Sequence, residues 1–289
     1  MTPNLMPQMS RDPRRCLSVV VAAIVLTASI GARPLAKGIT YRVRVSSRLP
    51  AIMAGTGGDA AGPLVLARAS AIGNRARFEL QSFQPMPPGV SLDDYLLVLD
   101  STQTVFVNTE EKTYVDATRM LGSGGLGMLS SMVSGRGGGG GMPQLDVSGL
   151  VTDFESVGKD TTDGKQTQHY RLVAEMTVNA MGRQMPLRIL IETWTADLPY
   201  HIVNPFDATA ARSPDDLAAK LSAKLAEYRK QIHGTPIKTV TTTTVTINAG
   251  GGPVALDFTQ TTQITDIKEA DVDDKRLDLP AGFTKKPSL

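Results

Sequence analysis

The chain has 289 residues, of which 41% are hydrophobic, 20% charged and 5% aromatic. This is enough apolar material for one sizeable core, and the charged fraction is too ordinary for a wholly disordered chain. With one Cys and three His, the sequence offers almost no ligands for a structural zinc or iron–sulfur site, so we expect no metal and no cofactor. The net charge of +2 gives no indication of a nucleic-acid partner.

Residues 1–32 show the three-part pattern of a secretory signal peptide. Arginines precede the uncharged apolar run Cys16–Ile30, and small residues follow it. A retained membrane anchor is the alternative, but a spanning helix needs roughly 20 apolar residues and this run is shorter. We expect cleavage near Gly31 or Ala32, no stable membrane span afterwards, and a periplasmic or extracellular location.

Removal of residues 1–32 takes away three Arg, one Asp and the only Cys, which leaves 27 basic and 27 acidic residues. The positive net charge of the full chain therefore comes from the expected signal peptide, not from the mature protein. A chain without Cys needs no disulfide, so its stability must come from packing. We expect residues 33–289 to form a single domain.

Alternation of apolar and polar residues with a period of two dominates the mature chain. A strand that alternates in this way has one buried face and one solvent-exposed face, as is typical of antiparallel sheets. The alternating segments are residues 39–45, 75–83, 170–178, 185–191 and 254–264.

Short turn-like segments separate neighbouring strands, which predicts hairpins between strands adjacent in sequence. These segments are residues 108–112, 163–164, 179–182 and 249–253. The β-branched run 239–246 also favours a strand. Its apolar parity changes between Val240 and Val245, so we expect a bulge or a twist there.

One amphipathic helix is predicted over Ser213–Gly234, because Ser213 is a good N-cap and Gly234 a good terminator. Its apolar stripe must cover something, most simply the concave face of the sheet. The stripe consists of Leu217, Leu221, Leu225, Tyr228 and Ile232.

The segment 120–142 threads methionines and leucines, among them Met128 and Met132, through many glycines. Glycine lowers order, whereas Met and Leu seek apolar contacts. The segment is either a flexible insertion in a hairpin connection or a mobile lid that samples the mouth of a cavity or a membrane surface.

No motif predicts catalysis, and we expect no enzymatic activity. The spaced glycines of residues 122–127 match a dinucleotide-binding pattern but lack the surrounding βαβ unit. We interpret the remaining chemistry-bearing residues as structural: the lone tryptophan as a core or rim residue, the acidic cluster as a solvated turn. These residues are His169, His201, His233, Trp194, Asp271, Asp273 and Asp274.

Four segments resemble a family of exported bacterial proteins related to the periplasmic outer-membrane lipoprotein carriers, the LolA/LolB-like fold. They occur in the family's order and span roughly Gly38 to Lys285, and they are residues 95–114, 164–172, 192–199 and 264–283. The resemblance implies an open β half-barrel with helices over its concave side, and a Met-rich segment after the first hairpin. It supplies no catalytic residues. The glycine run 137–141 departs from the family pattern.

Taken together, the sequence predicts a mainly β (α+β) protein: an antiparallel open β half-barrel covered by one or two helices. We expect it to bind a hydrophobic ligand, such as an acyl chain or a lipid, in its concave face. The alternative is a structural or interaction protein of the envelope with a filled core. The sequence identifies no protein partner. The expected cover and lining residues are Leu217, Leu221, Leu225, Tyr228, Met128 and Met132.

Overall fold

The computed structural model describes residues 36–50, 60–84, 86, 89–117, 146–180, 183–206, 223–224, 226–249 and 252–287. The expected signal peptide and the 120–142 insertion lie outside these residues, as does the start of the predicted helix.

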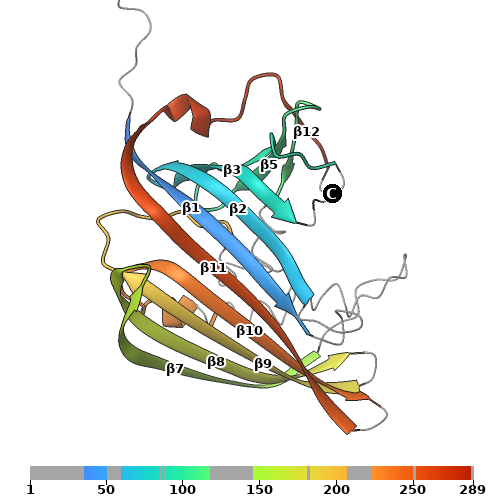
Figure 1. Cartoon of the computed structure of the whole chain (residues 1–289). Coiled ribbons are helices and arrows are strands. Elements are labelled where there is room, and N and C mark those ends of the chain that lie inside the picture. Colours follow the sequence, from blue (N-terminus) through green and yellow to red (C-terminus); the bar gives the residue numbers. More distant parts are fainter. Residues whose placement is uncertain are drawn as a thin grey trace, which may run out of the picture. The chain divides into compact units, whose positions relative to one another are not determined.

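The described strands form one open 12-stranded sheet (Figure 1). Its order is β12-β6-β5-β4-β3-β2-β1-β11-β10-β9-β8-β7, and every pair is antiparallel except β12 with β6. The strands are β1 (Ala36–Leu49), β2 (Ala60–Ile72), β3 (Arg75–Gln84), β4 (Tyr95–Val98), β5 (Thr104–Asn108), β6 (Thr113–Asp116), β7 (Asp146–Thr162), β8 (Lys165–Ala180), β9 (Arg183–Ala196), β10 (Thr235–Ala249), β11 (Gly252–Val272) and β12 (Thr284–Lys285).

The hairpins predicted from the turn segments are confirmed. Strands β5 and β6, β8 and β9, and β10 and β11 pair directly. Between β7 and β8, Asp163 and Gly164 have φ angles of 51° and 71°, and Thr162 pairs with Lys165. A two-residue turn with both central φ angles positive matches the twist of the flanking strands, which is why glycine suits its second position.

Of the bulge or twist expected between Val240 and Val245, the bulge is absent from this part of β10. β10 pairs with β11 without a shift from Lys238 to Ala249, and its irregularity against β9 lies between Pro236 and Lys238. The apolar parity changes because Thr241 and Thr243 take buried positions in the strand. A threonine carries a methyl group that tolerates such a position, so the strand needs no bulge to reconcile the pattern.

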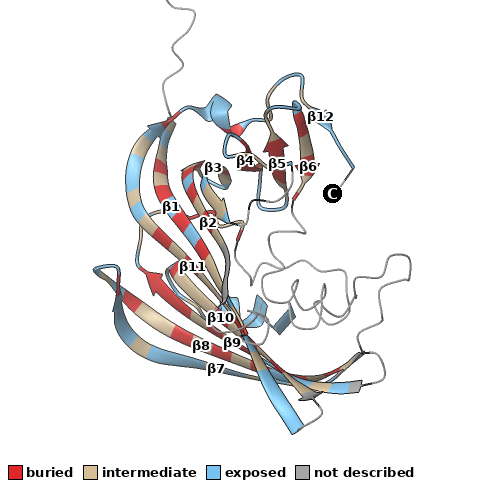
Figure 2. Ribbon diagram, turned by 45° about the vertical axis from the view of Figure 1, so that its right-hand side comes forward, coloured by how far each residue is buried: buried red, intermediate tan, exposed pale blue. Residues whose placement is uncertain are grey.

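One face of the sheet carries Val43 of β1 and Ile189 of β9, and we call it the inner face. The opposite face is called the outer face. Figure 2 shows buried residues recurring at intervals along the strands, as the alternating pattern predicted. An apolar cluster that we call cluster 1 lies on the inner face of β1–β4 and includes Tyr41, Val43 and Phe78. Side chains from the loop after β9 pack into it. The loop side chains of cluster 1 are Leu198, Tyr200, Ile202, Val203 and Phe206.

A hydrogen bond ties this loop to the sheet. The hydroxyl of Tyr41, which is 1% exposed, donates to the carbonyl of Val203 at 2.5 Å. Burial raises the pKa of Tyr41 far above its ordinary value, so the hydroxyl remains a donor at every physiological pH. The loop therefore covers the inner face of β1–β4.

The C-terminal segment covers the outer face of the same end of the sheet, over β3–β5. The 3₁₀ helix η3 (Asp274–Leu277) pairs with β3 through Arg276–Glu79 and Arg75–Asp274, at 2.5 and 2.9 Å. Leu279 and Phe283 then pack on cluster 3, the outer-face residues of β4 and β5. Strand β4 is thus buried on both faces, which explains why all four of its residues are buried.

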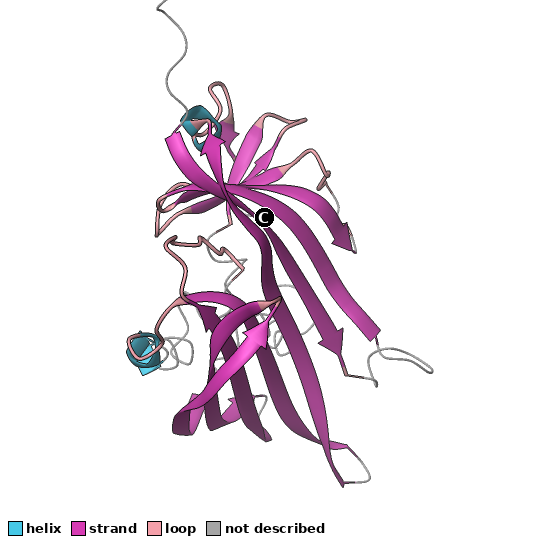
Figure 3. Ribbon diagram, turned by 60° about the vertical axis from the view of Figure 1, so that its left-hand side comes forward, coloured by secondary structure: helices cyan, strands magenta, loops and turns pink. Residues whose placement is uncertain are grey.

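Helix is scarce in the described part of the chain: η3, and residues 223–224 and 226–229 (Figure 3). The described residues thus show a mainly β protein, but they do not show the expected cover of one or two helices. No helix within them is long and apolar enough to cross a membrane.

Candidate functional site

A second apolar cluster lies on the inner face of β8, β9, β10 and β11, and we call it cluster 2. It is formed by alternate residues of the strands, as period-two patterning requires. Its buried members are Leu172, Ala174, Met176, Val178, Leu187, Ile189, Ile191, Val245 and Phe258. Tyr228 packs against this cluster.

An apolar chamber of about 210 Å³ lies between cluster 2 and the chain around Tyr228. Three stacked rings form one wall: Phe154 lies 5.9 Å from Tyr170 and 5.2 Å from Tyr228, with interplanar angles of 15° and 18°. Leu172 and Ile191 of cluster 2 line the chamber beside them. The lining is thus largely hydrocarbon and aromatic, as in sites that bind apolar ligands.

Specific hydrogen bonds hold the chain at residues 228–234 against the sheet. The hydroxyls of Tyr228 and Thr152 lie 2.6 Å apart, and Thr195 Oγ1 donates to the carbonyl of His233 at 2.6 Å. Gly234 has a φ of +87°, and a side chain there would meet the carbonyl oxygen of Ala196 at 2.9 Å. Only glycine fits so close to β9 in this conformation, so the sequence itself places this wall of the chamber.

A second chamber of about 400 Å³ adjoins the apolar one, and both are lined by Arg229, Pro236 and Thr239. Its lining mixes apolar side chains such as Ile202 and Ile264 with carboxylate, amide and imidazole groups, and we call it the polar chamber for those groups. Its other walls are the β4–β5 turn and the loop after β9, which contribute Asp100, His201 and Asn204. Its volume falls in the range of about 300–1,000 Å³ that is usual for small-molecule sites.

Hydrogen bonds also order the polar chamber's walls. Asp100 Oδ1 accepts from the backbone N–H of Thr102 and of Gln103, at 2.6 and 2.9 Å. Thr235 Oγ1 donates to the carbonyl of Tyr200 at 3.1 Å. The polar groups of the chamber are therefore carried by ordered turns, as a preformed site requires.

Buried threonines extend along the inner face beside the two chambers. Thr193, Thr241 and Thr262 are each 6% exposed and Thr243 is fully buried. Within the described part of the chain the hydroxyl of Thr243 has no hydrogen-bond partner, a loss that costs about 1–3 kcal/mol for a buried polar group. The inner face is therefore not uniformly apolar: it offers hydroxyls between cluster 1 and cluster 2.

Of the predicted site residues only Tyr228 lies within the described part of the chain, and it lines the apolar chamber. Leu217, Leu221, Leu225, Met128 and Met132 lie outside the described residues. Sequence reasoning did not select the other aromatic rings of the chamber, Phe154 and Tyr170. The parity of Tyr170 in its strand was the available signal, since it shares a face with Leu172.

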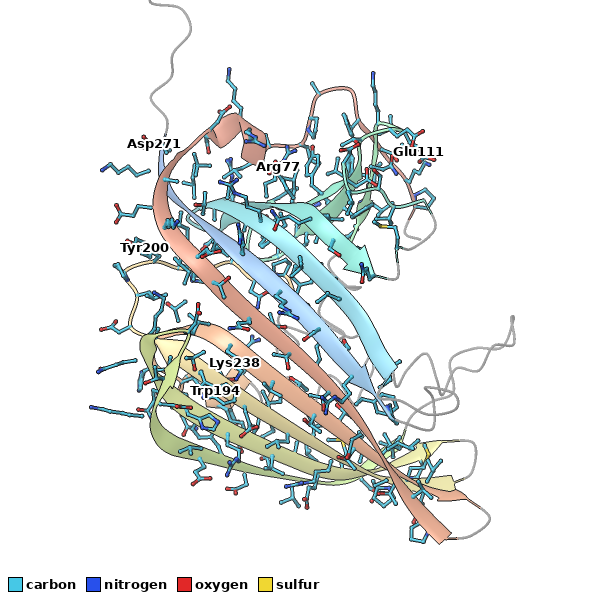
Figure 4. All side chains as sticks on the ribbon, viewed as in Figure 1. Arg77, Glu111, Trp194, Tyr200, Lys238 and Asp271 are labelled. Carbon is cyan, nitrogen blue, oxygen red and sulfur yellow. The ribbon has the colours of Figure 1, made fainter. Side chains whose placement is uncertain are left out.

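The outer face of β7–β10 carries a stacked ladder of side chains centred on Trp194 (Figure 4). His169 stacks on the indole at 4.3 Å and 6°, and Lys238 Nζ lies 4.3 Å from the ring centroid. The indole N–H donates to Asp160 Oδ2 at 2.7 Å. His169 from β8 and Lys238 from β10 flank Trp194 in the register, so the tryptophan is a packed residue rather than an open platform for a sugar.

The hydrogen bond from Trp194 lowers the pKa of Asp160 below its usual range, with a smaller contribution from the backbone N–H of Thr161. The charged form of Asp160 is thus favoured, and the contact is lost only as the pH falls through this lowered pKa. Trp194 is the only tryptophan, so tryptophan fluorescence reports on this site.

We expect an acid titration of Trp194 emission to show a transition below pH ~3.9, the ordinary value for Asp. The Asp160→Asn variant should lack it. Asp163→Asn, which removes a carboxylate from the neighbouring turn, should keep it. A transition that persists in Asp160→Asn would contradict the assignment.

Other predicted structural roles hold for the described residues. Asp273 caps η3 and Asp274 pairs with Arg75, so these two residues form an exposed turn as predicted. Asp271 does not belong to that turn, because it lies in β11 opposite Lys37. No group of three or more His, Cys, Asp or Glu among the described residues could hold a metal ion.

No protein-family profile and no curated protein sequence matches the chain. Two solved structures are similar to it. LprF from Mycobacterium bovis is 14% identical, with a TM-score of 0.27 over 84% of this chain and 90% of that one. The lipoprotein LppX from Mycobacterium tuberculosis is 10% identical, with a TM-score of 0.24 over 91% and 100%. These likenesses are distant, and the proposals below depend on this chain's own residues.

Proposed function

We propose that the mature protein is a non-enzymatic, exported protein that binds a hydrophobic ligand, an acyl chain or a lipid, on the inner face of its sheet. The observation that carries the proposal is the apolar chamber of about 210 Å³ with its wall of three stacked rings. An engineered apolar cavity of roughly 150 Å³ is already large enough to bind benzene. The chamber therefore has room for a stretch of hydrocarbon.

In this proposal residues 33–289 form one LolA/LolB-like half-barrel, and residues 1–32 are its signal peptide. The predicted helix Ser213–Gly234 and the 120–142 segment act as covers, with Leu217, Leu221, Leu225, Met128 and Met132 facing the ligand. The placement of Tyr228 on cluster 2 supports the helix's part in this arrangement. The motif resemblance supports the half-barrel and the periplasmic or extracellular location.

The first test is whether the mature protein carries a ligand. Native mass spectrometry and lipid extraction should reveal a copurifying hydrophobic molecule, and a fluorescent fatty-acid probe should bind the delipidated protein. A clean apo spectrum together with no probe binding would overturn the proposal.

A substitution at Thr239 tests where the ligand binds. Thr239 lines both chambers, so a Thr239→Phe side chain would fill the space between them. Exclusion of two methylenes forfeits about 1.6 kcal/mol, so we expect the Kd for the probe to rise about 10-fold or more.

The matched control is Thr242→Phe, at the opposite parity of the same strand, where Thr242 contacts Thr259 on the neighbouring strand. It should leave probe affinity unchanged. Equal effects of the two substitutions would show that the probe binds elsewhere.

A structural or interaction protein of the envelope is the second candidate. The packing of cluster 1 under the loop Leu198–Phe206 favours it, because side chains of that loop cover much of this part of the inner face. The absence of both a copurified ligand and probe binding would support this candidate instead.

A further inference from the structure

The outer face of β1 and β2 carries basic side chains that no acidic residue of either strand balances. Arg42 and Arg44 alternate with Val43 of the inner face, so both lie on the outer face. Arg68 of β2 lies opposite Arg42 in the register and therefore shares that face. All three arginines are exposed. Neither strand contains an Asp or a Glu, although residues 33–289 as a whole have basic and acidic residues in equal number.

The acidic residue beside Arg68 on the next strand is already engaged. Glu79 of β3 lies opposite Arg68 in the register. Its carboxylate instead contacts Arg276 and Arg77, at 2.5 and 3.3 Å. Within the described residues Arg68 has no ion pair and no hydrogen bond, and the same holds for Arg44. The described part of the chain therefore leaves the charges of these two arginines unbalanced.

Arg42, the third of these arginines, pairs with Asp266 at 3.1 Å, and more than half of each side chain is exposed. An exposed pair of this kind stabilises a fold only weakly. Arg42 and Arg68 lie directly opposite each other, and Arg44 is the diagonal neighbour of Arg68. Like charges in such positions repel and destabilise a sheet. An anionic partner over the three guanidinium groups would turn this repulsion into attraction.

Two leucines lie on the same face, where the alternating pattern of a strand places polar residues. Leu66 pairs with Arg44 and Leu64 with Ser46, so both belong to the outer face. They are half-buried, and neither is a member of cluster 1, 2 or 3. Packing in these cores therefore does not explain them. We define the outer patch as Arg42, Arg44, Leu64, Leu66 and Arg68.

We propose that the outer patch docks the protein on a membrane surface that contains anionic phospholipids. The guanidinium groups offer forked N–H donors to lipid phosphates, and the leucines enter the hydrocarbon between the head groups. The leucines favour a lipid surface over a nucleic acid, which presents phosphates without hydrocarbon beside them. β1 and β2 lie next to β11 in the middle of the sheet, so the patch occupies a broad face and not an edge (Figure 1). The inference goes beyond the proposed function and needs no ligand on the inner face.

Cosedimentation with vesicles tests the proposal. The mature protein is mixed with vesicles of phosphatidylcholine alone, or of equal parts phosphatidylcholine and phosphatidylglycerol. We expect binding to the anionic vesicles to be about 10-fold tighter or more, because each basic residue near an anionic surface contributes a factor of about five. Raised salt should reduce this preference, because exposed charges are screened.

The double variant Arg44→Gln/Arg68→Gln should bind the anionic vesicles about 30-fold more weakly, which is the loss of two such factors. The matched control is Lys159→Gln/Lys230→Gln, which removes two exposed charges outside the patch and should bind as the wild type does. Leu66→Asn should weaken binding to the anionic vesicles while the salt dependence remains, since it removes hydrocarbon and no charge.

Thermal unfolding shows whether the variants are folded. Arg68→Gln removes the repulsion between β1 and β2, so its Tm should equal or exceed that of the wild type. Equal binding to anionic and neutral vesicles, or undiminished binding by the folded double variant, would overturn the proposal. A DNA duplex or polyglutamate that binds as tightly as the anionic vesicles would also overturn it, in favour of a soluble polyanion. None of these outcomes affects the proposed function, which the fatty-acid probe tests separately.

Discussion

Replacement of Phe78 by alanine is expected to lower the free energy of unfolding by about 3–5 kcal/mol. Phe78 is fully buried in cluster 1. Its ring meets Tyr41 and Phe206 edge to face, with centroids 6.1 Å apart in both pairs. Alanine would leave a cavity between the sheet and the loop after β9, and it would remove two aromatic contacts that each stabilise by about 0.5–1.5 kcal/mol.

Thermal unfolding followed by circular dichroism measures this loss. For a chain of this size the expected fall in Tm is roughly 6–20 °C. Leu92→Ala, at a side chain that is 48% exposed, is the control and should change stability by about 0.5 kcal/mol or less. A Phe78→Ala protein within about 1 kcal/mol of the wild type would show that cluster 1 is not the packed core described above.

The second large effect is expected at Gly38, at the start of β1. A side chain there would overlap the carbonyl oxygen of Ala71 on β2 and would lie 2.9 Å from Val272 Cγ2 on β11. Because one obstacle is backbone, it cannot rotate away, and Gly38→Ala should destabilise by about 3 kcal/mol. β1 lies between β2 and β11, so the overlap strains the centre of the sheet.

Chemical denaturation of Gly38→Ala beside Lys37→Ala tests this expectation. Lys37 is exposed at the neighbouring position, and its truncation should change stability by about 0.5 kcal/mol or less. If Gly38→Ala fails to accumulate as folded protein while Lys37→Ala does, the expectation is met. Equal stability of the two variants would show that β1 and β2 are further apart at this point.

Much of the sheet was predictable because its strands alternate. Ile39 to Val45 and Tyr170 to Val178 share one parity within each strand, and the structure buries those residues on one face. The hairpins were equally accessible, since turns such as Asp163-Gly164 require residues that tolerate positive φ. The sequence misled only where Thr241 and Thr243 take core positions that the pattern assigns to apolar residues.

The candidate site was less predictable. Tyr228 was selected through its helical spacing. Phe154 comes from the edge strand β7, 74 residues earlier in the chain. The polar chamber combines the β4–β5 turn, the loop after β9 and the start of β10. None of these segments carries a recognisable motif, because each contributes one or two ordinary polar groups.

By itself the sequence determined the class of protein: an antiparallel sheet without disulfides, with a pattern typical of export at its beginning. Those properties depend on neighbours in the chain, on period-two alternation and on local turn chemistry, which a single sequence displays directly. Only the tertiary structure decided that the loop after β9 fills cluster 1 while a chamber stays open beside cluster 2. That difference depends on which distant side chains meet across the inner face, and no local pattern encodes such volumes.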